Sequence, residues 1–200
     1  MQQIVLATGN QGKVREFKQM LSEHSFEILP QSQFKVSEVD ETGLTFVENA
    51  ILKARHASEV SGLPAIADDS GIEVDALNGA PGIYSARYAG VGASDHENLD
   101  KLLHDIAEVE DPLRTARFQC VLVLMRHAKD PTPLICQGTW EGSLLKAAVG
   151  ENGFGYDPIF WLDDNQCTSA QLNPEIKDQL SHRGQALRQL VRLIEKSGYL

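Results

Sequence analysis

The chain has few cysteines, and their spacing suits neither a disulfide framework nor a zinc site. Only three occur among 200 residues, at Cys120, Cys136 and Cys167, and no two have C-x-x-C spacing. The six histidines are also scattered, and none forms an H-x-x-x-H pair. We therefore expect reduced thiols in a cytoplasmic protein.

Long hydrophobic runs are also missing. The longest unbroken run of aliphatic and methionine side chains is Val121–Met125, far short of the roughly 20 residues that span a bilayer. No basic stretch followed by an apolar segment stands near the N-terminus, so neither a secretory signal nor a membrane partner is expected. With 42% apolar and 23% charged residues, the composition predicts an ordinary globular protein of one domain, residues 1–200.

Positive charge is scarce: the chain has 18 Lys and Arg residues but 28 Asp and Glu residues, which gives a formal net charge of −10. A general nucleic-acid binder needs a broad positive face that neutralises phosphates, so we expect no nucleic-acid partner. A small polyanionic ligand is still compatible with this balance. It requires a local basic cluster or a divalent cation held by some of the acids.

Apolar strand patterns mix with amphipathic helix patterns along the whole chain. Strands are predicted at Ile4–Ala7, Phe26–Leu29, Ala116–Met125, Pro133–Trp140 and Ile159–Leu162, and helices at Gly12–Glu23, after the caps Thr45, Ser94 and Asn173, and from Ser181. The stretch "PAIADDSGIEVDAL" predicts two short strands interrupted at Asp68–Gly71. This order predicts an α/β fold with a mixed β-sheet flanked by helices.

The turn after the first strand has the chemistry of an anion site. Gly9 and Gly12 permit close backbone approach, and Lys13 adds a positive charge in the first turn of the following helix. It is not a Walker P-loop, because only two residues separate the glycines and Val14 follows the lysine. The alternative is a tight strand-to-helix turn with a solvent-facing lysine.

Three acids are candidates for a metal site. Asp68 and Asp69 follow an apolar strand, and adjacent strand residues face opposite sides, so one carboxylate is expected to project into a cleft. If Glu41 meets Asp69, the two carboxylates suit one Mg²⁺ that keeps several waters. Lys53 is placed to face the same cleft. The alternative is ordinary turn chemistry at Asp68–Asp69 and solvated charges at Glu41 and Lys53.

A late aromatic loop and a basic helix start are candidates for binding a nucleobase. In "NGFGYDP", Phe154 or Tyr156 is placed to stack on a base, and Asp157 to accept from ring N–H groups. The stretch "KDQLSHRG" gathers donors that could read a purine carbonyl, namely Lys177, Ser181, His182 and Arg183, and arginine suits the O6/N7 edge of a 6-oxo purine. The alternatives are plain core aromatics and ordinary solvated charges at a helix N-terminus.

Taken together, these segments resemble the inosine/xanthosine triphosphate pyrophosphatase family over nearly the full length. The matching motifs are "LATGNQGK", "ETGLTFVENAILKA", "ADDSGIEVDALNGAPGIYSARYAG", "GFGYDPIF" and "SHRGQAL". By this resemblance, the triphosphate is bound by Thr8, Gly9, Asn10, Gln11, Gly12 and Lys13, and the base and adjoining groups by Phe154, Gly155, Tyr156, Asp157, Lys177, His182 and Arg183. It further makes Glu41 and Asp69 the metal ligands, Asp69 the general base and Ser70 a substrate contact. Lys53 and Asp68 also match family positions.

The resemblance implies a Mg²⁺-dependent enzyme that hydrolyses dITP, ITP and XTP to the monophosphate and pyrophosphate, which cleanses the nucleotide pool. It also implies a homodimer and an elongated α/β fold of two lobes with an active-site cleft between them. The alternative from another class is a purine-nucleotide sensor that binds without cleaving. Such a sensor has no need of Glu41 and Asp69 placed for a catalytic metal.

Overall fold

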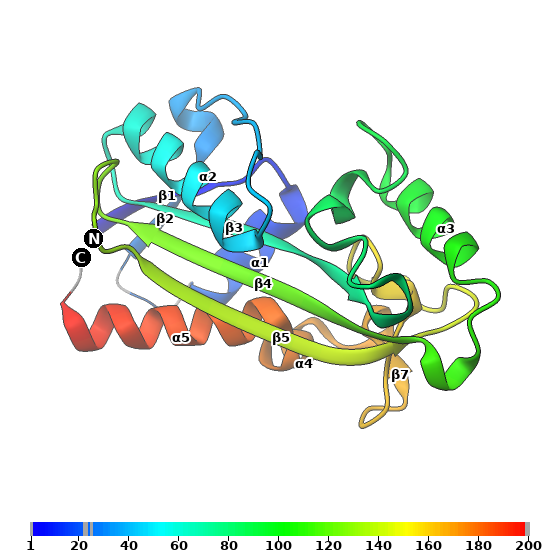
Figure 1. The fold of residues 1–200 in the computed structure, drawn as a ribbon. Coiled ribbons are helices and arrows are strands. Elements are labelled where there is room, and N and C mark those ends of the chain that lie inside the picture. Colours follow the sequence, from blue (N-terminus) through cyan, green and yellow to red (C-terminus); the bar gives the residue numbers. More distant parts are fainter. Residues whose placement is uncertain (1, 22–23, 25, 199–200) are drawn as a thin grey trace. The chain divides into compact units, whose positions relative to one another are not determined.

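A computed structural model describes residues 2–21, 24 and 26–198 of the chain (Figure 1). Its regular elements are β1 Gln2–Ala7, α1 Gln11–Met20, β2 Phe26–Pro30, α2 Phe46–Ser61, β3 Ala65–Val74, α3 Asp95–Asp105, β4 Thr115–Met125, β5 Leu134–Leu144, β6 Phe160–Leu162, β7 Cys167–Thr168, α4 Pro174–Leu180 and α5 His182–Ser197. None of the helices in the described part of the chain combines the length and apolar character needed to cross a membrane.

The strands form one seven-stranded sheet in the order β2-β1-β3-β4-β5-β6-β7. Strand β1 pairs in parallel with β2 and β3, whereas β6 pairs antiparallel with both β5 and β7. The sheet is therefore mixed, and the predicted α/β class is confirmed. Strand β7 has only two residues and was not predicted.

The described chain divides into two compact units. Unit 1 comprises residues 1–69, 120–138 and 183–200, and unit 2 comprises residues 70–119 and 139–182. Strands β3, β4 and β5 contribute residues to both units. The predicted cleft between two lobes remains a prediction.

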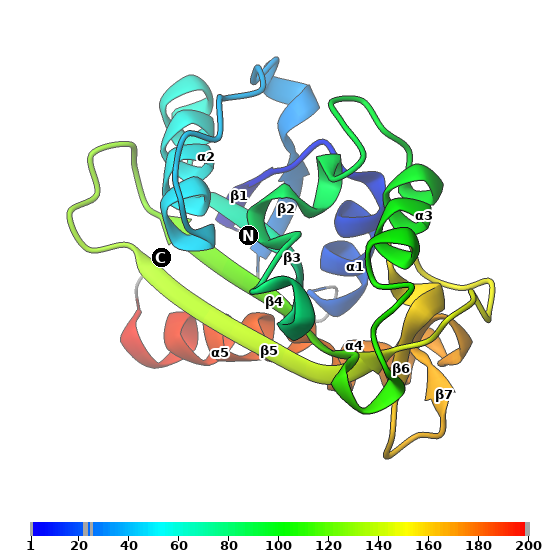
Figure 2. The same cartoon turned by 45° about the vertical axis from the view of Figure 1, so that its right-hand side comes forward.

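Unit 1 has two apolar layers, and the two-residue period of its strands assigns each residue to one of them. Ile4 and Leu6 pack with residues of α1 and α5, whereas Val5 and Ala7 pack with alanines of α2. In β3, Ile66 belongs to the first layer and Ala67 to the second. Figure 2 shows α2 and α5 on opposite sides of the strands. Asp68 therefore continues the α1 and α5 side, and Asp69 the α2 side.

Strand β3 runs without a break through the stretch where an interruption was predicted, so that prediction was wrong. Ser70 and Gly71 continue the strand and do not turn the chain. The glycine serves close packing, because a Cβ at Gly71 would lie 2.3 Å from the carbonyl oxygen of Gly82 and 2.5 Å from Ser85 Oγ. The two aspartates tolerate burial in a strand because cations from distant segments pair with them.

The predicted helix caps are present. Thr45 Oγ1 accepts from the backbone N–H of Glu48, and Ser94 with Glu97 forms a complete capping box at α3. The Glu48 carboxylate accepts from the N–H of Leu44 at 2.9 Å and from Thr45 Oγ1 at 2.8 Å. The first helix ends at Met20, earlier than predicted, and the predicted end at Glu23 lies outside the described residues.

Unit 2 has its own apolar core. Ile72 and Val74 of β3 pack with Leu99 and Leu102 of α3 and with a group of aromatic side chains. The aromatic members are Phe118, Trp140, Tyr156 and Phe160. This core supports the segment 153–157 that precedes β6.

Candidate active site

The turn between β1 and α1 leads into the N-terminus of α1, and hydrogen bonds from its own side chains to its backbone hold its conformation. Thr8 Oγ1 accepts from the backbone N–H of Asn10 at 3.2 Å, and Asn10 Oδ1 accepts from that of Lys13 at 3.1 Å. Asn10 is thus the N-cap of α1. Gln11 donates through Nε2 to the carbonyl of Gly9 at 3.4 Å. The predicted helix N-terminus with a lysine in its first turn is present, and anion binding at this turn remains a prediction.

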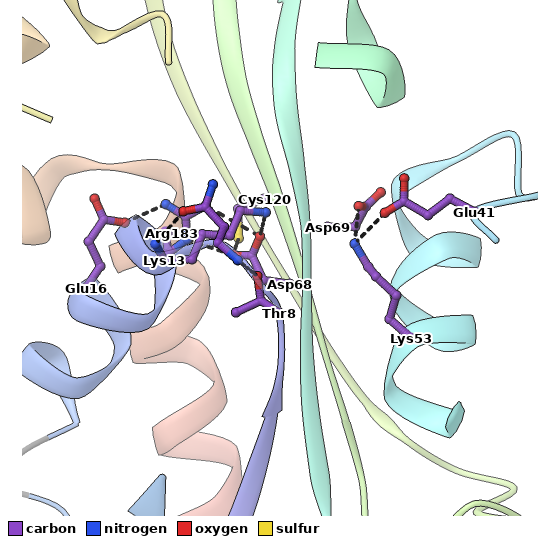
Figure 3. A network of polar contacts seen from close by, with 10 residues as sticks. Thr8, Lys13, Glu16, Glu41, Lys53, Asp68, Asp69, Cys120 and Arg183 are labelled. Atoms are coloured by element: carbon purple, nitrogen blue, oxygen red, sulfur yellow. Dashed lines mark hydrogen bonds and ion pairs between the residues drawn. The ribbon is translucent and has the colours of Figure 1, made fainter. Parts of the chain in front are cut away.

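On the α1 side of β3, Asp68 joins a chain of buried and partly buried charges (Figure 3). Its Oδ1 lies 2.5 Å from Lys13 Nζ, and its Oδ2 accepts from Arg183 Nε at 2.7 Å and from Cys120 Sγ at 3.3 Å. The guanidinium of Arg183 also donates through Nη1 to Glu16 Oε2 at 2.6 Å. Two cations and two anions from α1, β3 and α5 therefore balance one another.

This pairing keeps Asp68 ionised in a fully buried position. Burial alone would raise the pKa of Asp68, but the charges of Arg183 and Lys13 outweigh it and hold the pKa well below its ordinary value. In the same environment, burial raises the pKa of Cys120 well above its ordinary value, so the thiol stays protonated and donates. Asp68 thereby fixes the position of Lys13 beside the turn.

On the α2 side of β3, Asp69 and Glu41 share the ammonium of Lys53 (Figure 3). Lys53 Nζ lies 2.5 Å from Asp69 Oδ1 and 3.0 Å from Glu41 Oε1. The structure thus brings the two candidate acids to one ammonium, and metal binding by them remains a prediction. The other oxygen of Asp69, Oδ2, is buried and has no hydrogen-bond partner among the described residues.

The electrostatics of this second cluster differ from those around Asp68. Burial raises the pKa of Asp69 above its ordinary value, and the Lys53 ammonium opposes that rise without cancelling it. Burial favours the neutral amine of Lys53, but Asp69 and Glu41 outweigh it and raise its pKa. Lys53 is therefore a cation at neutral pH, and Asp69 is the more basic of the two adjacent aspartates.

The segment that carries Glu41 is held in place by a buried asparagine of α2. Asn49 Oδ1 accepts from the backbone N–H of Gly43 at 2.8 Å, and the N–H of Thr42 donates to the carbonyl of Asp40 at 3.0 Å. The sequence pattern did not predict this tether. An asparagine inside a capped helix gives no local sign of a distant backbone partner.

The carboxylates of Glu41 and Asp69 fit a divalent cation. Carboxylate oxygens are the ligands that hard cations prefer, and the buried Oδ2 of Asp69 lacks the hydrogen bond that such an atom ordinarily has. No group of three or more His, Cys, Asp or Glu side chains suited to a metal occurs within the described ranges. Two protein ligands suit a cation that also binds water and phosphate oxygens.

In unit 2, the predicted base-binding loop is organised around Asp157. This buried carboxylate accepts from the backbone N–H of Phe154 at 2.8 Å, from Ser169 Oγ at 2.7 Å and from Lys177 Nζ at 2.7 Å. Only glycine fits at residue 153, where φ is +80° and a Cβ would lie 2.1 Å from Asp157 Oδ2. Asp157 therefore shapes the loop and positions Lys177, a role that the sequence pattern did not predict.

The two aromatic residues of this loop have different environments. Tyr156 is buried, and its hydroxyl donates to the carbonyl of Ser85 at 2.8 Å, so the core alternative holds for this residue. Phe154 is half-buried, and Lys177 Nζ lies 5.2 Å from the centre of its ring. The backbone N–H of Gly155 donates to Asp95 at the start of α3, at 2.9 Å. Phe154 is thus the candidate for stacking on a base.

The other predicted substrate-binding residues are His182, Ser70 and Arg183, and each has a defined environment. His182 stacks on Phe118 with ring centroids 4.8 Å apart and an interplanar angle of 13°. Ser70 follows Asp69 in β3 and is half-buried. Arg183 was predicted to contact the base, and its guanidinium is bonded to Asp68 and Glu16 with a side chain 3% exposed. Base contacts by His182 and Arg183 remain predictions.

The sequence did not predict three members of these networks, Glu16, Cys120 and Ser169. Glu16 carries a weak signal, because it follows Lys13 by one turn on the same helix face. Cys120 and Ser169 carry none, since each acts on an aspartate distant in the sequence.

Comparison with known proteins gives consistent matches over nearly the whole chain. The model of the Ham1 family matches residues 4–193. A protein of Vibrio cholerae named dITP/XTP pyrophosphatase is 63% identical over 196 residues, which cover 98% of each chain. A protein of Shewanella oneidensis with the same name is 60% identical over 198 residues, which cover 99% of this chain and 96% of the other.

Solved structures of Ham1 proteins also match this chain over nearly its full length. A HAM1 protein from Coxiella burnetii has a TM-score of 0.91 at 49% identity, covering 98% of this chain and all of the other. The Staphylococcus aureus Ham1 protein has a TM-score of 0.86 at 43% identity, covering 98% of this chain and 99% of the other. These matches extend through both units. The chain therefore belongs to the Ham1 family.

Proposed function

We propose that this chain is a nucleoside triphosphate pyrophosphatase that hydrolyses dITP, ITP and XTP to the monophosphate and pyrophosphate. Its relatives from Vibrio cholerae and Shewanella oneidensis carry the name dITP/XTP pyrophosphatase and match nearly the full chain. Removal of such nucleotides cleanses the pool of purines that have lost their amino group.

One observation carries this proposal: Asp69 has a buried carboxylate oxygen without a hydrogen-bond partner among the described residues, and a second acid, Glu41, lies beside it. A protein that only binds a nucleotide has no need of such an arrangement. A hydrolase uses such a carboxylate to take a proton from the attacking water.

We assign Glu41 and Asp69 as the residues that would hold Mg²⁺. When bound, the cation would neutralise phosphate charge and make a coordinated water more acidic. Asp69 serves as the general base for the water that attacks the α-phosphorus. The raised pKa of Asp69 strengthens it as a proton acceptor.

The turn from Thr8 to Lys13 binds the triphosphate. Its backbone N–H groups and the Lys13 ammonium stabilise the negative charge that builds on the departing pyrophosphate. Asp68 keeps that ammonium in place, because the two groups lie 2.5 Å apart. Ser70 contributes a further polar contact to substrate.

In unit 2, Phe154 stacks on the base, and Lys177 donates to the carbonyl oxygen that distinguishes hypoxanthine and xanthine from adenine. An ammonium is a donor only, so it would face the amino donor of adenine unfavourably. Asp157 and Ser169 position this lysine. His182 and Arg183 add the remaining predicted contacts to the base and adjoining groups.

The test is a substrate panel of dITP, ITP, XTP, dATP and dGTP with Mg²⁺, analysed for both products. We expect stoichiometric pyrophosphate and monophosphate from the first three nucleotides, and much slower release from dATP. Orthophosphate as the first product, or tight binding of dITP without cleavage, would contradict the proposal. The second outcome would identify the chain as a nucleotide sensor.

We further propose a homodimer in the cytoplasm that has no nucleic-acid partner. The net charge of −10 supports the last point, and three cysteines outside any disulfide suit a reducing compartment. Sedimentation velocity tests the dimer, and a titration with single-stranded and duplex DNA at moderate salt tests the absence of nucleic-acid binding.

A further inference from the structure

Lys53 occupies an unusual position for a lysine expected to bind substrate. Its ammonium lies between the two proposed metal ligands, 2.5 Å from Asp69 Oδ1 and 3.0 Å from Glu41 Oε1 (Figure 3). The three side chains are largely shielded from water, with exposed fractions of 17% for Lys53, 9% for Asp69 and 23% for Glu41. Solvent therefore screens their charges poorly.

The Lys53 ammonium changes the net charge that a divalent cation would meet at Glu41 and Asp69. Two carboxylates with one ammonium carry a net charge of −1, and without the ammonium they carry −2. A divalent cation is attracted by the carboxylates and repelled by the ammonium, which already bonds to an oxygen of each. Because Lys53 is anchored on helix α2, its local concentration does not fall when the protein is diluted.

We propose that Lys53 is a tethered competitor of the divalent cation, and that it lowers the affinity of the nucleotide-free protein for the metal. This inference rests on the proposed role of Glu41 and Asp69 as metal ligands. The opposite possibility is that Lys53 holds the two carboxylates in a geometry ready for the metal. The two differ in sign, because removal of a competitor tightens metal binding and removal of an organiser weakens it.

The experiment is a calorimetric titration of nucleotide-free protein with Mn²⁺, repeated with Mg²⁺. Lys53→Met keeps most of the apolar stem and removes the charge. We expect it to bind either metal at least about tenfold more tightly, since a unit charge within a few ångströms of a shielded cation has an effect of that size or more. An unchanged or weaker affinity, or no detectable binding to Lys53→Met at millimolar metal, would overturn the proposal.

Two further variants separate the charge from other effects. Lys53→Arg keeps the cation and is expected to bind metal no more tightly than the parent. Arg55→Met removes a positive charge two residues away on the same helix, where the guanidinium bonds to the carbonyl of Ala128 at 3.0 Å. It is expected to change metal affinity by less than about twofold. An equal gain in Arg55→Met would show that net charge alone is responsible and would contradict the inference.

Folding and function are checked separately. Circular dichroism melts of each variant, with and without Mn²⁺, show whether the protein is folded, and Lys53→Gln replaces Lys53→Met if the latter is not. Pyrophosphate release from dITP by the parent protein tests the proposed function without reference to Lys53. A parent that cleaves dITP while Lys53→Met gains no metal affinity refutes this inference and leaves the proposed function intact.

Discussion

On one side of strand β3, both carboxylate oxygens of Asp68 accept hydrogen bonds. On the other side, Asp69 accepts through Oδ1, and its Oδ2 has no partner within the described part of the chain. The residues are neighbours of the same chemical type, and both are buried. Asp68 meets two cations, Lys13 and Arg183, and its pKa is held low. Asp69 meets one cation that it shares with Glu41, and its pKa is raised.

This difference indicates which carboxylate can accept a proton or bind a cation. A fully bonded, ionised carboxylate has no lone pair left to offer a ligand, so Asp68 serves to position other groups. A carboxylate with an unbonded oxygen and a raised pKa can accept a proton or bind a cation. The same residue type is thus a structural anchor on one face of the strand and the proposed reactive group on the other.

The largest expected effect is a loss of catalytic rate in the variant Asp69→Asn. Loss of the base and of one metal-binding oxygen should lower the rate of pyrophosphate release from dITP by about 10²–10⁴-fold. Stability should change little, because Lys53 keeps its pair with Glu41 at 3.0 Å. A time course of pyrophosphate release at saturating Mg²⁺ measures this. Parent-like activity would refute the assignment of Asp69 as the base.

The next effect is on stability, in the reciprocal variant Asp68→Asn. It leaves buried Arg183 and partly buried Lys13 without their shared anion, and removal of one partner from a buried ion pair costs about 3–5 kcal/mol in the free energy of unfolding. Urea denaturation of this variant beside Asp69→Asn measures the contrast. If the two variants lose equal stability, the difference between the two sides of the strand does not hold.

The smallest effect is expected for Glu16→Gln, at the far end of the Asp68 network. The amide can still accept from Arg183 Nη1 but without a full charge, so we expect a loss of about 1 kcal/mol in unfolding free energy. Because Asp68 remains paired with Lys13, pyrophosphate release should stay close to that of the parent. A loss as large as that of Asp68→Asn would show that Glu16 anchors the network more than Asp68 does.

Much of the fold could be predicted from local patterns. The apolar run Ile4–Ala7, the caps at Thr45 and Ser94, and the apolar stripe of the last helix all appear as expected. These features depend on residues within a few positions of one another. The wrong prediction at Asp68–Gly71 has the same origin, because acids followed by glycine are typical of turns when only neighbours are considered.

The sequence named candidate residues for the site but did not predict which of them bond to one another. The sequence indicated that Lys13, Glu41, Lys53 and Asp69 carry charges suited to a polyphosphate and a metal. It did not indicate that Asp157 would be enclosed by Phe154, Ser169 and Lys177, or that Arg183 would bond to Asp68. Both arrangements join segments that no periodicity links.

By itself, the sequence determined most of the strands and helices, that a lysine stands at the first helix N-terminus, and that the two aspartates face opposite ways, because each follows from near-neighbour geometry. Only the tertiary structure decided which aspartate is fully paired and which keeps an unbonded oxygen. The physical reason is distance along the chain: Arg183 lies 115 positions from Asp68, and its charge acts on that carboxylate only after folding brings α5 against the strand.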